Sequence, residues 1–321
     1  MPVCEADPWR LQYFEAVPCP ADVLIPTEDC DAWVWYPRAN WIYDKLRIAQ
    51  SQGLDCGPHG IVPQRFPVFS KPIFNLKGMG VGSGALRSLA EYEANYAPGH
   101  FWTELLTGEH LSTDCAVVAG EVRWWRHATG KPFGPNGMFD YWTIHGEGRP
   151  ALEDYVGSWV GRHLAGYTGM LNVETLGGRI IEAHLRFADQ WPDLYGKGWV
   201  EALVRLYAEK RWDFPEEGQR HDGYSVVLFG RHGRHFRHPP ADLQRAVRAM
   251  PGVESLQITF HETKPPEDHA APPGGFRLAI VNTRDLDAGF AARRRIAEAF
   301  APDDLLWPEG ARPHALATGA L

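Results

Sequence analysis

Residues 44 to 212 alternate between stretches with the two-residue repeat of a strand and stretches with the repeat of a helix. The helical repeat predicts helices over 40–50, 86–96, 151–165 and 198–210. The alternating pattern predicts strands over 66–72, 101–106, 112–119 and 121–127. Residues 169–186 have the pattern of a hairpin that turns at Gly177-Gly178. Helices mixed with antiparallel strands predict an α+β fold.

The regions on either side have shorter patterns. Residues 1–43 contain two apolar stretches, Asp22–Pro26 and Ala32–Tyr36, which we expect to form a small sheet fragment. A charged segment follows Trp212, and residues 213–321 combine strands and helices in an order typical of a small α+β module. We therefore interpret 1–43 as an N-terminal region, 44–212 as the central domain and 213–321 as a C-terminal module.

The composition is that of a globular protein with an acidic surplus. The 321 residues are 44% hydrophobic and 22% charged, with a formal net charge of -8. A negative balance disfavours nonspecific binding to nucleic acid or to anionic membranes. No apolar run is long enough for a membrane span, and the N-terminus lacks the pattern of a signal peptide. We expect a cytoplasmic protein without nucleic-acid or membrane partners.

The cysteines give no sign of a disulfide framework or a zinc site. They are odd in number and none has CxxC spacing, so we expect reduced thiols at Cys4, Cys19, Cys30, Cys56 and Cys115.

A glycine-rich segment at 75–84 follows the predicted strand that ends in Ser70-Lys71-Pro72. Glycines let backbone N–H groups approach an anion closely, and Lys71 and Lys77 add positive charge, so the segment fits a polyphosphate. It matches neither the P-loop nor the dinucleotide-binding pattern. A plain flexible turn is the alternative.

Glu174 and Glu182 lie on the two arms of the predicted hairpin. Their odd separation places them directly opposite each other if the turn contains three residues. Asn172 and His184 would share their face, while Val173, Ile181 and Ala183 would point into a core. Two adjacent carboxylates repel each other unless a divalent cation lies between them, and oxygen ligands of this kind suit Mg²⁺. Two solvated glutamates on a sheet surface are the alternative.

In this order, the features resemble those of the ATP-grasp superfamily, which includes biotin carboxylase, D-alanine–D-alanine ligase and the carboxylate–amine ligases. The resemblance is good over about 40–190, with a small lobe at about 66–106. It implies that Lys45 and Lys71 contact ATP phosphates and that residues 75–84 form a lid over the triphosphate. The lid residues expected to contact the nucleotide are Lys77, Gly78, Gly80, Gly82 and Ser83.

The resemblance also assigns a hinge and a metal site. Residues 101–109 resemble the hinge, where Glu104 and the backbone of Leu105 and Leu106 would meet adenine and Glu109 the ribose hydroxyls. Residues 172–186 resemble the metal segment, which implies magnesium ligands at Glu174 and Glu182.

Two departures from the family pattern stand out. His184 occupies the position of an asparagine that is usually a third metal ligand, and imidazole is a poor ligand for Mg²⁺. His184 therefore either faces substrate or favours a softer metal, with Mn²⁺ as the alternative ion. The region before Lys45 is also much shorter than the usual N-terminal domain. The substrate site would then be built from other parts of the chain, such as a loop expected at 129–148.

The implied chemistry activates a carboxylate as an acyl-phosphate and joins it to an amine. ATP and Mg²⁺ would be required, the substrates would be small molecules, and Arg186 and Lys71 would be the catalytic residues near the transferred phosphate. We expect the substrate side to include Arg123, Arg126, Lys131, Tyr141, Trp142 and Trp191.

Two other functions remain open. One is a regulatory or scaffold protein that binds ATP without turnover, and the other is a phosphotransferase that releases a stable phosphorylated product. No residue pattern fixes the oligomeric state, and a homodimer is one of the states left open.

Overall fold

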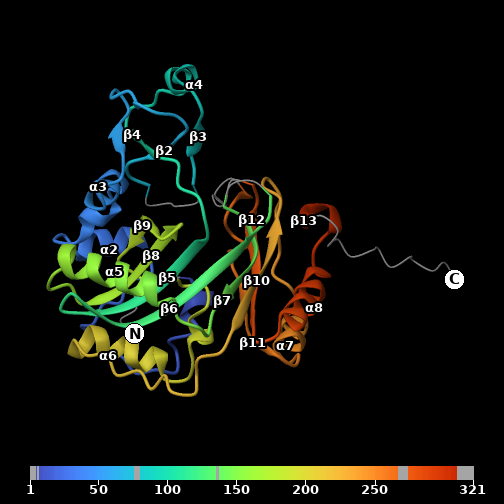
Figure 1. Cartoon of the computed structure of the whole chain (residues 1–321). Helices are drawn as coiled ribbons and strands as arrows, with labels where there is room; N and C mark the ends of the chain where they lie inside the picture. The colour runs from blue at the N-terminus through green and yellow to red at the C-terminus, as the bar shows by residue number, and fades with distance from the viewer. Residues whose placement is uncertain (1–4, 6, 76–79, 135–136, 267–273, 309–321) are drawn as a thin grey trace. The chain divides into compact units, whose positions relative to one another are not determined.

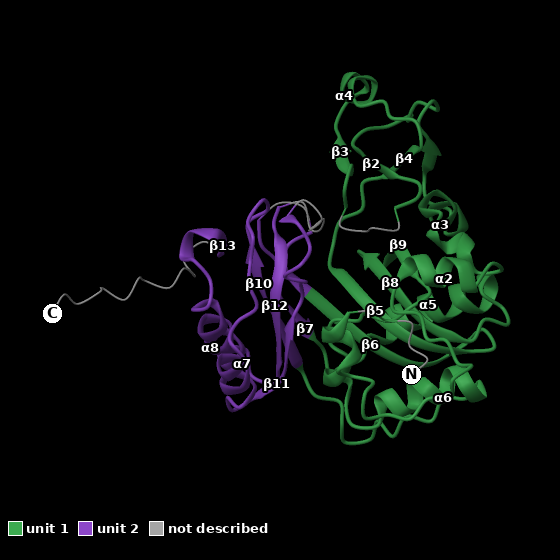
Figure 2. Ribbon diagram, turned by 180° about the vertical axis from the view of Figure 1, so that it is seen from behind, with its two compact units in different colours: residues 1–129, 144–222 green, residues 130–143, 223–321 purple. Residues whose placement is uncertain are grey.

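The computed structural model describes residues 5, 7–75, 80–134, 137–266 and 274–308. Two compact units make up the chain, and Figure 2 colours them separately: residues 1–129 with 144–222, and residues 130–143 with 223–321. Each unit mixes helices with strands, which confirms the predicted α+β class. Within the described ranges, no helix combines the length and the apolar character that a membrane span requires.

Unit 1 contains a small antiparallel sheet, which we call the small lobe (Figure 1). Its strand order is β1 (Cys56–Pro58), β4 (His100–Glu104), β2 (Val68–Pro72) and β3 (Gly84–Leu86). Helix α4 (Leu89–Ala94) follows β3 and begins after Ser88, whose hydroxyl accepts a hydrogen bond from the N–H of Glu91. The core of this lobe is formed by Val68, Leu86, Tyr92 and Trp102.

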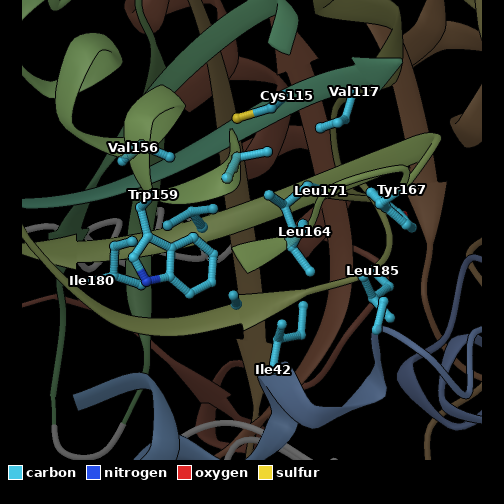
Figure 3. Packing of buried hydrophobic residues seen from close by; sticks show 14 of the residues in the cluster. Ile42, Cys115, Val117, Val156, Trp159, Leu164, Tyr167, Leu171, Ile180 and Leu185 are labelled. Carbon is cyan, nitrogen blue, oxygen red and sulfur yellow. The ribbon is translucent and has the colours of Figure 1, made fainter. Parts of the chain in front are cut away.

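A larger sheet of unit 1 carries the hairpin with the paired glutamates. Its neighbouring strands are β6 (Glu121–Pro132), β5 (His110–Val118), β8 (Gly169–Leu176) and β9 (Arg179–His184), and they pair antiparallel. Helix α5 (Pro150–His163) packs its apolar residues against one face of this sheet (Figure 3). The buried cluster on that face includes Cys115, Val156, Trp159, Leu171, Val173, Ile180 and Ala183.

The β8–β9 hairpin contains a bulge that the sequence did not predict. Gly177 and Gly178 both have positive φ and form a two-residue turn that pairs Leu176 with Arg179, in place of the expected three-residue turn. The register then shifts by one residue at Ile181, so Glu174 still lies directly opposite Glu182. The shift also exchanges the core positions: Ile180 is 1% exposed and packs in the core. The prediction that Ile181 points into the core is therefore wrong.

The N-terminal region is not the expected sheet fragment. Residues 22–26 form no regular element, and the predicted strand at Ala32–Tyr36 is part of helix α2 (Asp29–Trp35). Acidic residues in the first turn, Asp29 and Asp31, favour a helix start, and Ala32 packs in the core with Trp33 and Tyr36 beside it. The apolar residues Ala32, Trp33 and Tyr36 therefore lie on one side of a helix. The stretch is too short for this helical spacing to be distinguished from a strand in the sequence.

The helix predicted over 40–50 is divided in two. A 3₁₀ turn, η1 (Asn40–Tyr43), precedes helix α3 (Lys45–Ser51), and the cap is Asp44, whose carboxylate accepts from the N–H of Arg47. This cap places Lys45 at the first helical position. The other elements of unit 1 are α1 (Pro8–Leu11), η2 (Pro192–Tyr195) and α6 (Trp199–Glu209).

Unit 2 contains the strands β11 (Val253–Ile258), β12 (Phe276–Thr283), β10 (Gly223–Gly230) and β7 (Phe139–Ile144), in that order. Helices α7 (Ala241–Arg248) and α8 (Leu286–Ala297) pack against this layer. A short segment, η4 (Pro302–Asp304), leads into β13 (Leu305–Leu306), which pairs with β10. The stretch 129–148 was expected to be a loop. It contains the end of β6 and all of β7 instead.

The bulge can be tested by stability. Ile180→Ala should lower the free energy of unfolding by about 2–5 kcal/mol, since it removes a fully buried side chain. Ile181→Ala should cost less than about 1 kcal/mol because Ile181 is only partly buried. Denaturant unfolding of both variants measures the difference, and equal losses would contradict the bulged register.

Candidate active site

Two rows of polar side chains cross the face of the larger sheet that is opposite its apolar core. The strand register sets Ser112, Glu174 and Glu182 side by side in one row. It sets Asp114, Asn172 and His184 side by side in the next. The alternation of side chains along each strand puts both rows on one face. The structure therefore confirms the predicted pairing of Glu174 with Glu182 and the prediction that Asn172 and His184 share their face.

Glu182 faces the two predicted phosphate-binding lysines. Lys45 Nζ lies 2.7 Å from Glu182 Oε1, and the Lys45 side chain is 7% exposed. Lys71 Nζ donates to the carbonyl oxygen of Ile181 at 2.8 Å, which anchors β2 to the bulge of β9. Burial and the nearby Lys45 ammonium lower the pKa of the Lys71 ammonium to about 8. Side chains far apart in the sequence thus meet at one point.

Glu174 pairs with a histidine that the sequence did not indicate. His110 Nε2 lies 3.2 Å from Glu174 Oε2. Burial raises the pKa of the Glu174 carboxyl, but the hydrogen bond and charge of His110 outweigh burial and lower this pKa to about 2. His110 begins β5, so only the order of the strands could have placed it beside β8. Each carboxylate of the pair therefore has its own basic neighbour, Lys45 for Glu182 and His110 for Glu174.

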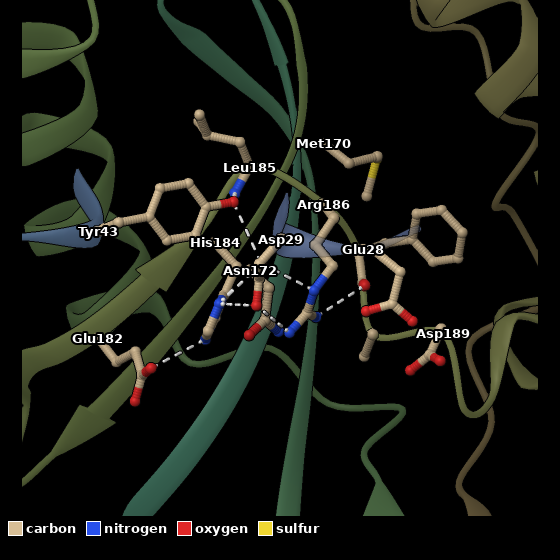
Figure 4. A network of polar contacts seen from close by, with 12 residues as sticks. Glu28, Asp29, Tyr43, Met170, Asn172, Glu182, His184, Leu185, Arg186 and Asp189 are labelled. Atoms are coloured by element: carbon tan, nitrogen blue, oxygen red, sulfur yellow. Dashed lines mark hydrogen bonds and ion pairs between the residues drawn. The ribbon is translucent and has the colours of Figure 1, made fainter. Parts of the chain in front are cut away.

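A buried carboxylate at Asp29 joins three elements next to the metal segment (Figure 4). Its oxygens lie 3.0 and 3.1 Å from His184 Nδ1, 3.0 Å from Arg186 Nε and 3.1 Å from the Tyr43 hydroxyl, which donates to it. Burial raises the pKa of the Asp29 carboxyl, but Arg186 and His184 outweigh burial and hold this pKa well below its usual range. Burial also lowers the pKa of His184, and Asp29 more than compensates and raises it.

Asp29 was missed because nothing local marks it. Its partners His184 and Arg186 are more than 150 positions away, and it lies in the stretch that was expected to be a sheet fragment. Arg186, which was predicted to be catalytic, is held by this carboxylate and also donates to the carbonyl oxygen of Phe187 at 3.2 Å.

A second buried carboxylate, Asp114, lies in the same row as Asn172 and His184. It accepts hydrogen bonds from Asn172 Nδ2, from the N–H of Ala188 and from the hydroxyl of Tyr195. Burial raises the pKa of Asp114 above its ordinary value. With three donors directed at it, Asp114 fixes the chain just beyond Arg186.

The predicted hinge connects the two sheets of unit 1. Glu104 ends β4, and its carboxylate accepts from the N–H of Asp55 at 3.2 Å. Glu109 accepts at its carbonyl oxygen from the N–H of Gly177, so the hinge rests on the β8–β9 turn. Leu105 and Leu106 lie between these points. The roles of these residues toward a nucleotide stay predictions.

The glycine-rich segment is described only in part. Gly80 and Gly82 have φ of 60 and 75, a conformation open to glycine, and the N–H of Ser83 donates to the carbonyl oxygen of Gly80 at 3.1 Å. Lys77 and Gly78 lie outside the described residues. Within the described part, the segment leads from β2 into β3 of the small lobe.

Three of the residues predicted for the substrate side, Arg123, Arg126 and Trp191, belong to unit 1, and their role toward a substrate stays a prediction. Arg126 is 2% exposed. Its guanidinium donates to the carbonyl oxygens of Tyr195 and His145, which connects β6 to these two segments. Trp191 is also buried and donates to the Tyr195 hydroxyl. Arg123 is exposed and pairs with Glu121. The remaining three belong to unit 2 and are Lys131, Tyr141 and Trp142.

In the described part of the chain, no three His, Cys, Asp or Glu side chains converge closely enough to hold a metal ion as they stand. Lys45 and His110 lie instead against the two carboxylates that were predicted to be metal ligands. The assignment of Glu174, Glu182 and His184 to a metal therefore stays a prediction.

Comparison with known proteins gives structural matches only. No protein-family model and no curated protein sequence matches the chain. Among solved structures, phosphoribosylamine–glycine ligase from Thermotoga maritima has a TM-score of 0.61 at 15% identity, covering 90% of this chain and 85% of that one. The L-amino acid ligase from Bacillus licheniformis has a TM-score of 0.58 at 12% identity, covering 91% and 82%.

A third match was solved with a nucleotide. N5-carboxyaminoimidazole synthase from Aspergillus clavatus, in complex with ADP and 5-aminoimidazole ribonucleotide, has a TM-score of 0.57 at 11% identity, covering 87% of this chain and 81% of that one. At such identities the likeness concerns the fold. The order and register of the strands and these matches together show that the chain has the ATP-grasp fold.

Proposed function

We propose that this protein is an ATP-dependent ligase that activates a carboxylate as an acyl-phosphate and joins it to an amine or a similar nucleophile. One observation carries the proposal. Glu174 and Glu182 lie directly opposite each other on the sheet, with Lys45 and Lys71 beside Glu182. Paired carboxylates next to converging ammonium groups can hold a divalent cation together with a polyphosphate. The ligases that share the fold support the same reaction class.

The carboxylate pair fits a divalent metal ion. Opposite residues of an antiparallel ladder have Cβ atoms only about 5 Å apart, so both carboxylates can reach one ion. Each carboxylate already has a basic side chain as its neighbour, Lys45 for Glu182 and His110 for Glu174. Mg²⁺, or Mn²⁺ in its place, would neutralise charge on the phosphate oxygens when bound.

Other residues would contact the phosphates and the adenine of the nucleotide. Lys45 and Lys71 would bind the phosphates, and the loop with Gly80, Gly82 and Ser83 would cover them, together with Lys77 and Gly78 outside the described residues. At the predicted hinge, Glu104 and the backbone of Leu105 and Leu106 would meet the adenine. Glu109 would meet the ribose hydroxyls.

The reaction needs little acid–base machinery. A carboxylate oxygen of the substrate attacks the γ-phosphorus, the bond to the bridging oxygen breaks, and ADP leaves with the electron pair. The amine then attacks the acyl carbon, phosphate leaves, and the nitrogen loses a proton. Lys71 and Arg186 hold positive charge beside the transferred group, and Asp29 keeps the Arg186 guanidinium in place.

A screen tests the reaction class. Purified protein with Mg-ATP should release ADP in the presence of one of a panel of carboxylic acids and amines, with a product whose mass equals acid plus amine minus water. Binding of Mg-ATP without turnover across the panel would favour a regulatory protein. A stable phosphorylated product would favour a phosphotransferase.

Glu182→Gln tests the metal assignment. We expect ADP release to fall roughly 100-fold or more, because the variant keeps the shape of the side chain but loses the charge that holds the ion. Glu201→Gln, at an exposed position of α6, is the matched control and should keep its rate. Unchanged turnover in Glu182→Gln removes the assignment.

The Lys71 ammonium predicts a pH dependence of nucleotide binding. Its pKa of about 8 means that the charged form predominates below this pH and is lost above it. Affinity for a non-hydrolysable ATP analogue should therefore fall as pH rises through 8, by about tenfold one unit above the pKa. Calorimetry measures the profile. In Lys71→Arg the guanidinium stays charged, so the profile should be flat over this range, and an equal fall there refutes the role of Lys71.

A further inference from the structure

In the described part of the chain, strand β9 lies at one edge of the larger sheet, and helix α3 lies beside it (Figure 1). The outer backbone groups of an edge strand need partners other than a neighbouring strand. At Ile180 this partner is a side-chain amide. Gln52 Nε2 donates to the carbonyl oxygen of Ile180 at 2.8 Å, and the N–H of Ile180 donates to Gln52 Oε1 at 2.8 Å. Gln52 thus forms the two hydrogen bonds that a residue of a further antiparallel strand would form.

The Gln52 amide has two more partners. Nε2 also donates to the carbonyl oxygen of Ile48 at 3.1 Å, and the Tyr155 hydroxyl donates to Oε1 at 2.6 Å. Both N–H groups and both acceptor directions of the amide are therefore used. Tyr155 belongs to α5 and Ile180 to β9, so this one side chain fixes the end of α3 to two other elements.

Helix α3 connects this attachment to the predicted phosphate-binding lysine at its other end. Lys45 is the first residue of the helix, and Gln52 directly follows its last residue, Ser51. A helix of this length is about 10 Å long and does not stretch, so a shift at one end moves the other. The Lys45 end is attached as well, because the Lys45 N–H donates to the carbonyl oxygen of Ile73, just after β2, at 2.9 Å. Helix α3 therefore connects the small lobe to the edge of the larger sheet.

We propose that Gln52 is a positioning residue for nucleotide binding, which fixes α3 along β9 so that the Lys45 ammonium lies where the phosphates bind. The inference rests on the proposed function, in which Lys45 binds the phosphates of ATP. An ammonium acts as a point charge, so its contribution depends on its distance to the phosphate oxygens. Loss of the two bonds to Ile180 lets α3 shift along the strand, and Lys45 then spends less time at the required distance.

Gln52→Met tests the contribution of the amide. Methionine is flexible and close to glutamine in size, but it forms none of the four amide hydrogen bonds. Calorimetry on the full-length protein, with a non-hydrolysable ATP analogue and Mg²⁺, should show an affinity about tenfold weaker than that of the wild type. Gln50→Met is the matched control, because Gln50 is exposed on the same helix, and its affinity should stay within about twofold.

A double-mutant cycle distinguishes positioning from a general loosening of the fold. In a protein that carries Lys45→Met, the group that Gln52 positions is absent, so the addition of Gln52→Met should change the affinity less than about twofold. Titration up to millimolar concentrations of the analogue includes these weaker complexes. An equal loss of affinity in both backgrounds shows that Gln52 acts on the fold in general, and it overturns the inference.

The wild-type protein tests the hydrogen bonds without any substitution. Amide hydrogen exchange followed by NMR should show the N–H of Ile180 protected to within about tenfold of the N–H of Val173, which lies in the neighbouring strand β8. An Ile180 N–H that exchanges as fast as an exposed loop amide shows that the bond to Gln52 is absent, and the inference fails.

The outcomes separate this inference from the function beneath it. If the wild type binds the analogue and Gln52→Met binds it equally well, Gln52 has no positioning role and the ligase proposal stands. If Lys45→Met keeps the wild-type affinity, the phosphate role of Lys45 and the inference fail together. If the wild type binds no analogue, the inference and the proposed function are both overturned.

Discussion

A single extra residue in the β8–β9 hairpin determines the geometry of the whole site. The Gly177-Gly178 turn pairs Leu176 with Arg179, and continued regular pairing would put Glu174 opposite Ile181. The bulge at Ile181 instead brings Glu182 into line with Glu174 and leaves the Ile181 carbonyl oxygen to accept from Lys71. One local irregularity therefore aligns two carboxylates and connects the small lobe to them.

The aligned carboxylates have basic neighbours from separate elements. Lys45 comes from the start of α3, Lys71 from β2 and His110 from the first position of β5. Each has a partner in or beside the carboxylate row, so the site is assembled where four segments of unit 1 meet. Beyond it, Asp29 and Asp114 fix His184, Arg186 and Ala188 through hydrogen bonds to buried carboxylates. Through these contacts Asp29, which precedes Lys45 in the chain, contributes to the site.

Sequence patterns predicted the parts that repeat along the chain. The strands of the larger sheet, helix α5 and the pairing of Glu174 with Glu182 all followed from periodicity and parity. The bulge was not predictable, because a two-residue turn with a bulge and a three-residue turn give the same pairing. Asp29 and His110 could not be found either, since their contacts depend on which segments become neighbours in space. The burial of Arg126 could not be predicted either, because it depends on a contact with Tyr195, far along the chain.

The central claim is that Glu174 and Glu182 hold a divalent ion against the phosphates of ATP. A crystal structure with a non-hydrolysable ATP analogue and Mg²⁺ or Mn²⁺ tests it most directly. The account predicts an ion about 2.0–2.2 Å from an oxygen of each glutamate and bonded to phosphate oxygens, with Lys45 Nζ moved from Glu182 to the phosphates. A nucleotide bound with no ion at these carboxylates, and with Lys45 still on Glu182, would contradict it.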